Sequence, residues 1–586
     1  MTSPPNVTTS QYSIARTGAN TNETCLSAAT WSNRPSPSIK VKYATVPANG
    51  STNSPVYAEP LYVYNLPIGP DGASRNVVFI ATLDDYVYAY DADNYTATQY
   101  YGVSLINDLQ DCNLNNKGIP IPHPGGGLPR AGIVSTPVIF LPPAATPTLT
   151  VVGGCQDSST GADSWYLHAL NLLTGQDLNT PIQIGASVSS SDGAAGCTGT
   201  NCDTLTFNPR FQLQRPALLQ IPDGTRTQIY VAFGVNGASE TKYTTNPYHG
   251  WLIGYMPGQS NPTFKFVTTP TGLNTNTTTP CTNNSGDAQT NKANTCGLGA
   301  GIWMAGKGIV AYNDSGTRYV YVGSGNGGFQ TGNTNWGSSV LGFVETATGT
   351  PPTTTFTPYR YRTLNYYDQD MGTSGPLLTD AYYLTIFDKT GQGYVLNPTS
   401  LGGFTSTDSG AVGEFQGSLT NGGTCNGSGT GCDEITSQVY WNGYLFLWPW
   451  NEDVDWCLWN GSNNFQCYPN NQNGGNGIFP VGFPGGTLAL SSNGDNQSTA
   501  ILWGIVLKNT AAPFIDPGTD LASYSGYLFA YQLQTAPTMS GAGSLVELWN
   551  SSADTWTAGI FAMPTVVNGR VYVPTYDQGV IVYANY

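Results

Sequence analysis

The chain has 586 residues, of which only 10% are charged, and its 36 acidic and 20 basic side chains leave a formal net charge of −16. So few cations cannot displace the counterions of a phosphate backbone, which argues against nucleic acid and an anionic membrane as partners. An apolar content of 39% and an aromatic content of 12% suffice for a packed interior and argue against a disordered chain. No apolar run approaches the ~18 residues of a membrane span, and the first residues lack the basic and apolar regions of a signal peptide.

Short runs of β-branched and aromatic residues recur along the chain between glycine-rich corners, a pattern typical of strands joined by tight turns. The run 77–91 holds two alternating strands around an Asp-Asp corner, as in the middle hairpin of a propeller blade. Similar units follow at 150–171, 229–255, 319–343, 383–397, 444–450, 501–531 and 571–583. The pattern therefore predicts an all-β fold, a single eight-bladed β-propeller of four-stranded antiparallel blades.

A short segment rich in small residues and proline precedes each hairpin, and we expect it to be the innermost strand, because such residues suit a crowded axis. These segments are 58–62, 135–139, 214–219, 302–308, 373–378, 436–441, 486–490 and 562–567. The alternating run 39–46 is expected to be the outer strand of the last blade, paired with 571–583, which would close the ring and remove an exposed edge. Residues 1–37 are then an extension packed on a propeller formed by 38–586.

Eleven cysteines point to disulfides in loop insertions, which lie at 104–132, 186–210, 270–300 and 405–435 and are expected to decorate one face. A metal site is a poor alternative, since the chain has only three histidines. Disulfides imply an oxidising compartment, so we expect a secreted or cell-surface protein. The expected bridges are Cys197–Cys202, Cys281–Cys296, Cys425–Cys432, Cys457–Cys467 and Cys112–Cys155, which leaves Cys25 unpaired.

N-x-S/T sequons make several asparagines candidates for glycosylation, although a chain rich in Asn, Ser and Thr also generates sequons by chance. The candidates are Asn6, Asn22, Asn49, Asn94, Asn276, Asn283, Asn313, Asn426, Asn460, Asn496 and Asn550.

Four motifs between 302 and 397 are similar to those of the pyrroloquinoline-quinone (PQQ) dehydrogenase propellers. They are I-W-M-A-G-K-G at 302–308, Y-V-Y-V-G-S-G-N at 319–326, D-Q-D-M-G-T-S-G-P-L-L at 368–378 and F-D-K-T-G-Q-G-Y-V-L at 387–396. The resemblance implies that Trp303 stacks on the quinone, Asn326 ligates Ca²⁺, Asp370 is the catalytic base and Lys389 contacts the quinone oxygens. Each has a structural alternative: a core tryptophan, a tight turn, a turn cap and a hairpin corner.

The opening Y-S-I-A-R-T-G-A-N-T-N-E-T at 12–24 and the closing P-T-V-V-N-G-R-V-Y-V at 564–573 resemble a group of exported, acidobacterial-type quinoprotein-like propellers. The likeness covers nearly the whole chain and implies the fold more than the chemistry. The chain departs from the PQQ enzymes because it has no adjacent cysteine pair, no C-x-x-C-H haem motif and no matching calcium-ligating glutamate.

Two functions follow as expectations. The first is a non-catalytic surface or matrix propeller, a rigid unit for adhesion, glycan binding or self-assembly whose partners are its own copies, surface proteins or glycans. The second is a Ca²⁺- and PQQ-dependent alcohol or sugar dehydrogenase with Asp370 as base. Arg130, Arg215, His249 and Lys307 either form a cationic throat for an anionic ligand or bond to buried backbone carbonyls.

Overall fold

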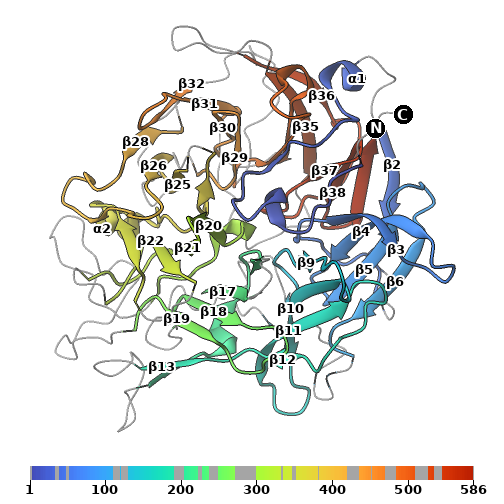
Figure 1. The fold of residues 1–586 in the computed structure, drawn as a ribbon, viewed down its shortest axis with the longest axis horizontal. Helices are drawn as coiled ribbons and strands as arrows, with labels where there is room; N and C mark the ends of the chain where they lie inside the picture. Colours follow the sequence, from blue (N-terminus) through green and yellow to red (C-terminus); the bar gives the residue numbers. More distant parts are fainter. Residues whose placement is uncertain are drawn as a thin grey trace.

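Eight small antiparallel sheets stand around a central axis, so the predicted all-β, eight-bladed propeller is confirmed (Figure 1). The fold is seen in a computed structural model. The structure describes residues 3–32, 38–47, 50, 52–107, 109, 112, 119–120, 130–189, 204–221, 228–235, 248–270, 299–330, 334–345, 351–380, 382–418, 434–450, 452–468, 484–508, 525–533 and 544–584.

Blades 1 to 4 follow the chain in order, each running outward from its innermost strand. Blade 1 contains β3 (Leu61–Pro67), β4 (Ser74–Ala81), β5 (Tyr86–Asp91) and β6 (Gln99–Ser104). Blade 2 contains β9 (Val138–Phe140), β10 (Thr148–Gln156), β11 (Asp163–Asn171) and β12 (Ile182–Gln183). Blade 3 contains β15 (Gln212–Leu213), β16 (Leu219–Gln220), β17 (Ile229–Val235), β18 (Trp251–Tyr255) and β19 (Phe264–Val267). Blade 4 contains β20 (Val310–Asp314), β21 (Thr317–Gly323), β22 (Val340–Val344), β23 (Thr354–Thr357) and the added β27 (Gly403–Phe404).

Blades 5 to 8 complete the ring. Blade 5 contains β24 (Leu377–Leu378), β25 (Leu384–Phe387), β26 (Gln392–Leu396) and β28 (Gly413–Gln416). Blade 6 contains β29 (Gln438–Trp441), β30 (Tyr444–Leu447), β31 (Asp455–Trp459) and β32 (Phe465–Tyr468). Blade 7 contains β33 (Thr487–Ser491), β34 (Ile501–Lys508), β35 (Ser525–Leu533) and β36 (Leu545–Asn550), with β1 (Ala19–Asn20) beside β33. Blade 8 contains β37 (Thr565–Val567), β38 (Arg570–Pro574), β39 (Val580–Ala584) and β2 (Ser38–Tyr43).

The elements outside the blades are short. The described residues contain two helices, α1 (Ala28–Ser32) and α2 (Tyr361–Tyr367), and the 3₁₀ turns η1 (Ser10–Tyr12), η2 (Pro209–Phe211), η4 (Met304–Gly306) and η5 (Gln497–Thr499). Two small hairpins, β7 (Ile119–Pro120) with β8 (Arg130–Ala131) and β13 (Ser187–Ser189) with β14 (Thr204–Thr206), lie in predicted insertions. No helix in the described ranges has the length and apolar content to cross a membrane.

The ring closes as the sequence predicted. Strand β2 pairs antiparallel with β39, with Ser38 opposite Ala584 and Tyr43 opposite Val580. The last blade therefore takes its outer strand from the start of the propeller and its other three from the end, and the two ends of the chain lie close together in Figure 1. This pairing removes two sheet edges and joins first and last blade into one cooperative unit.

The innermost strands begin later than predicted. The expected strand 58–62 corresponds to β3, which starts at Leu61, and 373–378 corresponds to β24, which starts at Leu377. In both blades a proline directly precedes the first paired residue, because proline has no N–H to give to the sheet ladder. The prediction for 302–308 is wrong: this segment contains the turn η4, and the inner strand of blade 4 is β20.

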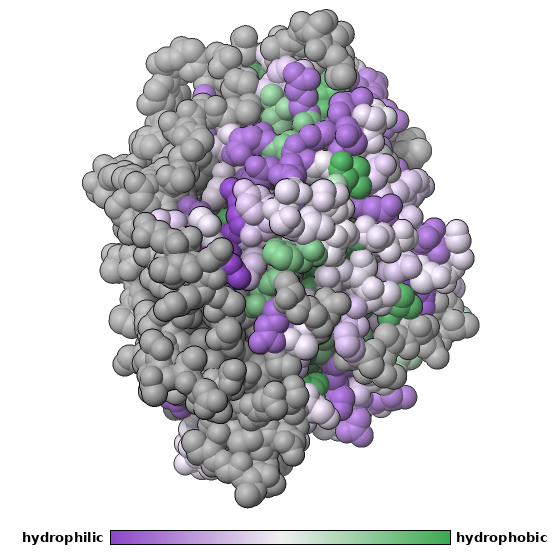
Figure 2. Space-filling model, turned by 90° about the vertical axis from the view of Figure 1, so that its left-hand side faces the viewer, coloured by the Kyte–Doolittle hydropathy of each residue, from purple (hydrophilic) through white to green (hydrophobic). Residues whose placement is uncertain are grey.

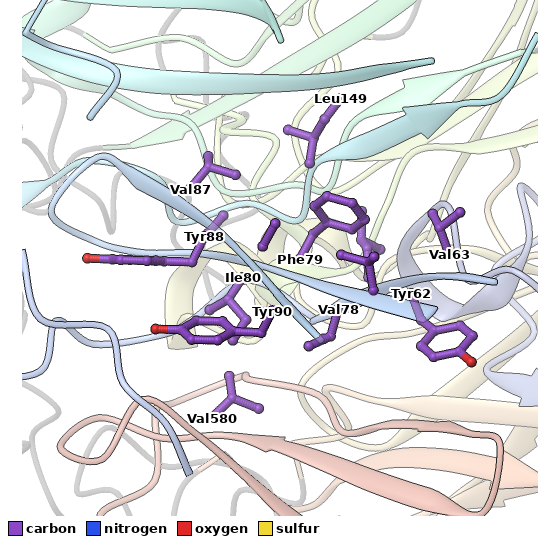
Figure 3. Close-up of a cluster of buried hydrophobic side chains, with 14 of the residues drawn as sticks. Tyr62, Val63, Val78, Phe79, Ile80, Val87, Tyr88, Tyr90, Leu149 and Val580 are labelled. Atoms are coloured by element: carbon purple, nitrogen blue, oxygen red, sulfur yellow. The ribbon is translucent and has the colours of Figure 1, made fainter. Parts of the chain in front are cut away.

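Neighbouring blades pack through aliphatic and aromatic side chains. Figure 3 shows Phe79, Tyr88 and Tyr90 of blade 1, with Leu149 of blade 2 on one side and Val580 of blade 8 on the other. All five side chains are buried, and the cluster runs across three blades. Each blade has a neighbouring blade on both faces of its sheet. Side chains on both faces of its strands are therefore buried, and the core continues from one blade to the next.

Residues 7–23, here named the N-terminal belt, bond to the inner part of every blade. The belt crosses the centre of the ring in dark blue in Figure 1. Its carbonyl groups accept from the inner strands of blades 1, 2, 4, 5, 6 and 7, at Tyr62, Ile139, Ala311, Leu378, Tyr440 and Leu490. Blade 3 is held by Arg16 Nη2, which donates to Leu218 O at 2.9 Å, and blade 8 by Val566 N, which donates to Tyr12 Oη at 2.8 Å.

Two of the expected disulfides lie in the described ranges, and both are formed: Cys112–Cys155 and Cys457–Cys467. Cys25 is exposed and unbridged, as expected. The pairs Cys197–Cys202, Cys281–Cys296 and Cys425–Cys432 lie outside the described residues. Of the sequon asparagines, Asn49, Asn276, Asn283 and Asn426 also lie outside them, and Asn6, Asn22, Asn94, Asn313, Asn460, Asn496 and Asn550 are exposed or half-buried.

Candidate functional site

The four residues that the resemblance selected lie together in one cluster, which is here named the hub. Trp303 directly precedes the turn η4, and Asn326 lies three residues beyond the end of β21. Asp370 follows α2, and Lys389 lies in the corner between β25 and β26. The cluster therefore joins segments of blades 4 and 5, and the roles implied for its members remain predictions.

An ion pair forms the centre of the cluster. Lys389 Nζ lies 2.9 Å from Asp370 Oδ1 and 3.4 Å from Asp368 Oδ1, and 5.3 Å from the centre of the Trp303 ring. Asn326 Nδ2 donates a hydrogen bond to Asp368 Oδ1. Asp370 is almost wholly buried, whereas the Asp368 side chain is 77% exposed, so the pair extends from the interior to solvent.

Close contacts at Gly325 explain the second glycine of the G-S-G-N motif at 323–326. A Cβ at this position would lie 2.6 Å from Asp370 Oδ2 and 3.0 Å from Trp303 Nε1. Both distances are shorter than normal contacts, so only glycine lets the carboxylate and the indole approach the strand end together. The glycine is thus part of how the sequence shapes this site.

Two further charged groups, Arg215 and Glu434, complete the site. The guanidinium of Arg215, from blade 3, lies 4.0 Å from the centre of the Phe561 ring and 5.7 Å from that of Trp303. Glu434 precedes β29 of blade 6 and is 3% exposed. The roles of Glu434 and Phe561 were missed at the sequence level. Glu434 stands two residues before the T-S-Q-V-Y-W run, and that position at the start of an inner strand was the available signal.

Burial dominates the electrostatics of the site. Desolvation raises the pKa of Glu434 to about 7, against the opposing effect of Lys389. Desolvation also raises the pKa of Asp370, again opposed by the Lys389 ammonium. For Lys389 itself burial favours the neutral amine, but Asp368 and Asp370 outweigh it and raise the pKa of the ammonium above its ordinary value. Such perturbed groups, gathered at one place, are typical of functional sites.

The residues present fit a planar anion better than they fit a complete calcium site. Trp303 offers a stacking surface, and Arg215 and Lys389 place two cations near its ring. Asn326 Oδ1 is buried and has no hydrogen-bond partner among the described residues, so an amide oxygen is present that suits a Ca²⁺ ligand. However, the described part of the chain contains no group of three or more His, Cys, Asp or Glu side chains that could hold a metal ion.

The three described side chains of the expected cationic throat make separate contacts. Lys307 Nζ donates to Gln438 O at 2.8 Å, and burial lowers the pKa of this amine. His249 bonds through Nδ1 to Thr269 Oγ1 at 2.7 Å, and burial lowers its pKa to about 4. The side chain of Arg130 lies outside the described residues. Lys307 therefore follows the alternative of bonding to a buried carbonyl, and Arg215 alone faces the Trp303 cluster.

The fold and the site together define an eight-bladed β-propeller with a charged, aromatic hub. Among solved structures, the chain is similar to the quinohemoprotein alcohol dehydrogenase from Comamonas testosteroni, with 12% identity over 99% of this chain and 80% of that one, and a TM-score of 0.47. It is also similar to Sqt1 from Saccharomyces cerevisiae, with 8% identity over 94% and 99% of the two chains and a TM-score of 0.42. A computationally designed protein, Ika8, shares 10% identity over 93% and 99%, with a TM-score of 0.40. No protein-family model and no curated protein matches the chain.

Proposed function

We propose that the hub of this propeller binds a planar, negatively charged small molecule, and that the ligand is a quinone cofactor used to oxidise an alcohol or a sugar. The observation that carries the proposal is the position of Arg215 and Lys389, two cations near one indole ring. The indole ring offers a stacking surface for the flat face of a planar anion, and the two cations attract the carboxylates of that anion.

In this proposal the chain's own residues divide the work. Trp303 stacks on the ligand, and Lys389 and Arg215 hold its anionic groups. Asp370 takes the proton of the substrate hydroxyl, because the adjacent ammonium keeps this buried carboxylate ionised while burial increases its basicity. A bound quinone would supply the two-electron acceptor. Asn326 offers one oxygen to Ca²⁺, and no step depends on that ion because the described residues do not complete a calcium site.

The test is a titration with PQQ, with and without Ca²⁺, followed by absorbance and by thermal melting. A ligand at about 100 times its Kd stabilises the folded state by about 2.7 kcal/mol. With an unfolding entropy of about 1.2 kcal/mol/K for a chain of this length, the melting temperature should rise by about 2 °C. Lys389→Met should abolish the shift, whereas Lys42→Met, a change at the outer strand of blade 8, should not. No shift at saturating PQQ would contradict the proposal.

A second candidate is a secreted, rigid unit for adhesion, glycan binding or assembly. The observation in its favour is the set of exposed aromatic side chains, of which Tyr359 is 53% and Tyr382 is 64% exposed. Such side chains bind glycans and proteins through large contact areas. The view in Figure 2 shows small hydrophobic areas scattered among hydrophilic ones over the described surface on that side.

Disulfides support export of such a unit, because they persist in oxidising compartments. Light scattering and electron microscopy should detect a regular polymer, or glycan arrays should detect binding. A strictly monomeric protein without glycan affinity would count against this candidate and leave the hub proposal untouched.

A further inference from the structure

A cavity of about 520 Å³ lies between blades 2 and 3, separate from the Trp303 cluster. It is lined by residues of β9, β10, β11 and β12 on one side and of β16, β17 and the segment after β18 on the other. These strands lie next to one another in the lower part of Figure 1. The volume falls within the range of small-molecule sites, which is about 300 to 1,000 Å³.

Both apolar and polar side chains line the cavity. Leu167 and Ile229 are 5% and 4% exposed, and the aromatic Phe140 is half-buried. Asn179 and Thr180 are exposed and carry an amide and a hydroxyl. A ligand that fits this mixed lining has carbon-bound hydrogens for the apolar side chains and polar groups for the amides and hydroxyls.

The described residues that line the cavity include no ionisable side chain. A charged ligand would lose its hydration there without gaining an opposite charge, which is costly. The occupant is therefore uncharged.

One buried amide in the cavity is incompletely bonded. Gln220 is 6% exposed, and its Oε1 accepts no hydrogen bond from any described residue. Its backbone is fixed by the pairing of β16 with β17, where Gln220 lies opposite Ile229. A buried carbonyl oxygen without a partner is destabilising by itself, so its presence in the lining of a cavity points to a ligand that donates a hydrogen bond to it.

From these observations we propose that the cavity between blades 2 and 3 binds a neutral saccharide unit. A sugar supplies a hydroxyl donor for Gln220 Oε1, a C–H face for Phe140, further hydroxyls for the polar side chains, and no charge. The site gives the second candidate function a location, and it rests on that candidate only for its biological role. It is independent of the hub ligand.

The experiment is saturation-transfer NMR on the full-length protein with D-glucose, D-galactose, D-mannose and N-acetyl-D-glucosamine. At least one should bind with a millimolar Kd. Glucuronate, the carboxylate counterpart of glucose, should bind at least tenfold more weakly than the best neutral sugar, because the cavity offers it no cation.

Gln220→Leu should weaken the binding at least tenfold, since it removes the hydrogen-bonding amide and keeps the size of the side chain. The matched control is Gln183→Leu on β12, because Gln183 is exposed, donates to Ser164 Oγ at 2.9 Å and does not line the cavity. Without sugar, Gln220→Leu should melt at or above the wild-type temperature, because it removes an unsatisfied buried carbonyl. That result excludes misfolding as the reason for lost binding. A second variant, Ala169→Leu, reduces the volume of the cavity and should also weaken binding.

Retained sugar affinity in Gln220→Leu, or equal affinity for glucuronate, would overturn this site and leave the second candidate function intact. No binding of any glycan would overturn this site and the glycan-binding form of the second candidate, and would leave adhesion or assembly as its remaining forms.

Discussion

Replacing Glu434 by glutamine should remove a penalty that the folded protein carries at neutral and alkaline pH. Folding raises the pKa of this carboxyl from 4.5 to about 7 through burial. Between these two pH values the unfolded chain has released the proton and the folded chain still holds it. Stability due to Glu434 is therefore full below pH 4.5 and falls as the pH rises through 7.

The size of the effect follows from the shift. A difference of 2.5 units, from 4.5 to 7, corresponds to about 3 kcal/mol at 1.36 kcal/mol per unit. The quantity to compare is the unfolding free energy of Glu434→Gln minus that of the wild type, at each pH. This difference should be about 3 kcal/mol larger at pH 8 than at pH 4. For a chain of this length the corresponding change in melting temperature is about 2 to 3 °C.

Calorimetric melting of both proteins from pH 4 to pH 8 measures this difference directly. The matched control is Asp71→Asn, because Asp71 is exposed and the backbone N–H of Ala73 and the Arg75 side chain lower its pKa. Stability from Asp71 is lost only when the pH falls through that lowered pKa, so the control should show no change between pH 4.5 and pH 8. A difference for Glu434→Gln that stays constant across the range would refute the assignment of a buried, protonated carboxyl.

Two further changes test the site and the belt. Gly325→Ala should cost about 1 to 3 kcal/mol of stability, because its Cβ would lie 2.6 Å from Asp370 Oδ2. In the control Gly185→Ala the added Cβ meets no atom within 4 Å, so the melting temperature should stay nearly unchanged. Arg16→Met should cost about 3 to 5 kcal/mol of stability, because it deprives several buried acceptors of their donor. Arg75→Met removes an exposed ion pair and an exposed hydrogen bond and should leave the melting temperature nearly unchanged. Equal melting temperatures within either pair would contradict these assignments.

Much of the fold was predictable because its signals are local. The hairpin 383–397 appears as β25 and β26, and 77–91 appears in β4 and β5, since alternation and corner residues are legible within a few positions. Closure of the ring was predictable from one alternating run at 39–46 that no other strand claimed. The predicted starts of the inner strands were too early, because the small residues and prolines that precede these strands do not take part in the hydrogen bonds of the sheet.

The site was only partly accessible from the sequence. Trp303, Asn326, Asp370 and Lys389 were selected by motif, and they lie together. Glu434 could not be connected with them, because its interaction with Lys389 exists only after blade 6 has packed beside blade 5. The hydrogen bonds of the belt could not be predicted either, because most of them use backbone carbonyl groups, which every residue type has.

The N-terminal belt also sets an order of events for a newly made chain. Its residues leave the ribosome before the blades to which they bond, and their acceptors and donors are distributed over blades that are synthesised up to residue 569, where Gly569 N donates to Glu23 Oε2. The belt can bond to blade 1 early, but its set of bonds is complete only when the last blade has been made. Contacts this distant in sequence slow folding, so the last step of maturation should be the completion of the belt's bonds. A polypeptide that stops short of its final blade would leave the belt without its bonds to Val566 and Gly569.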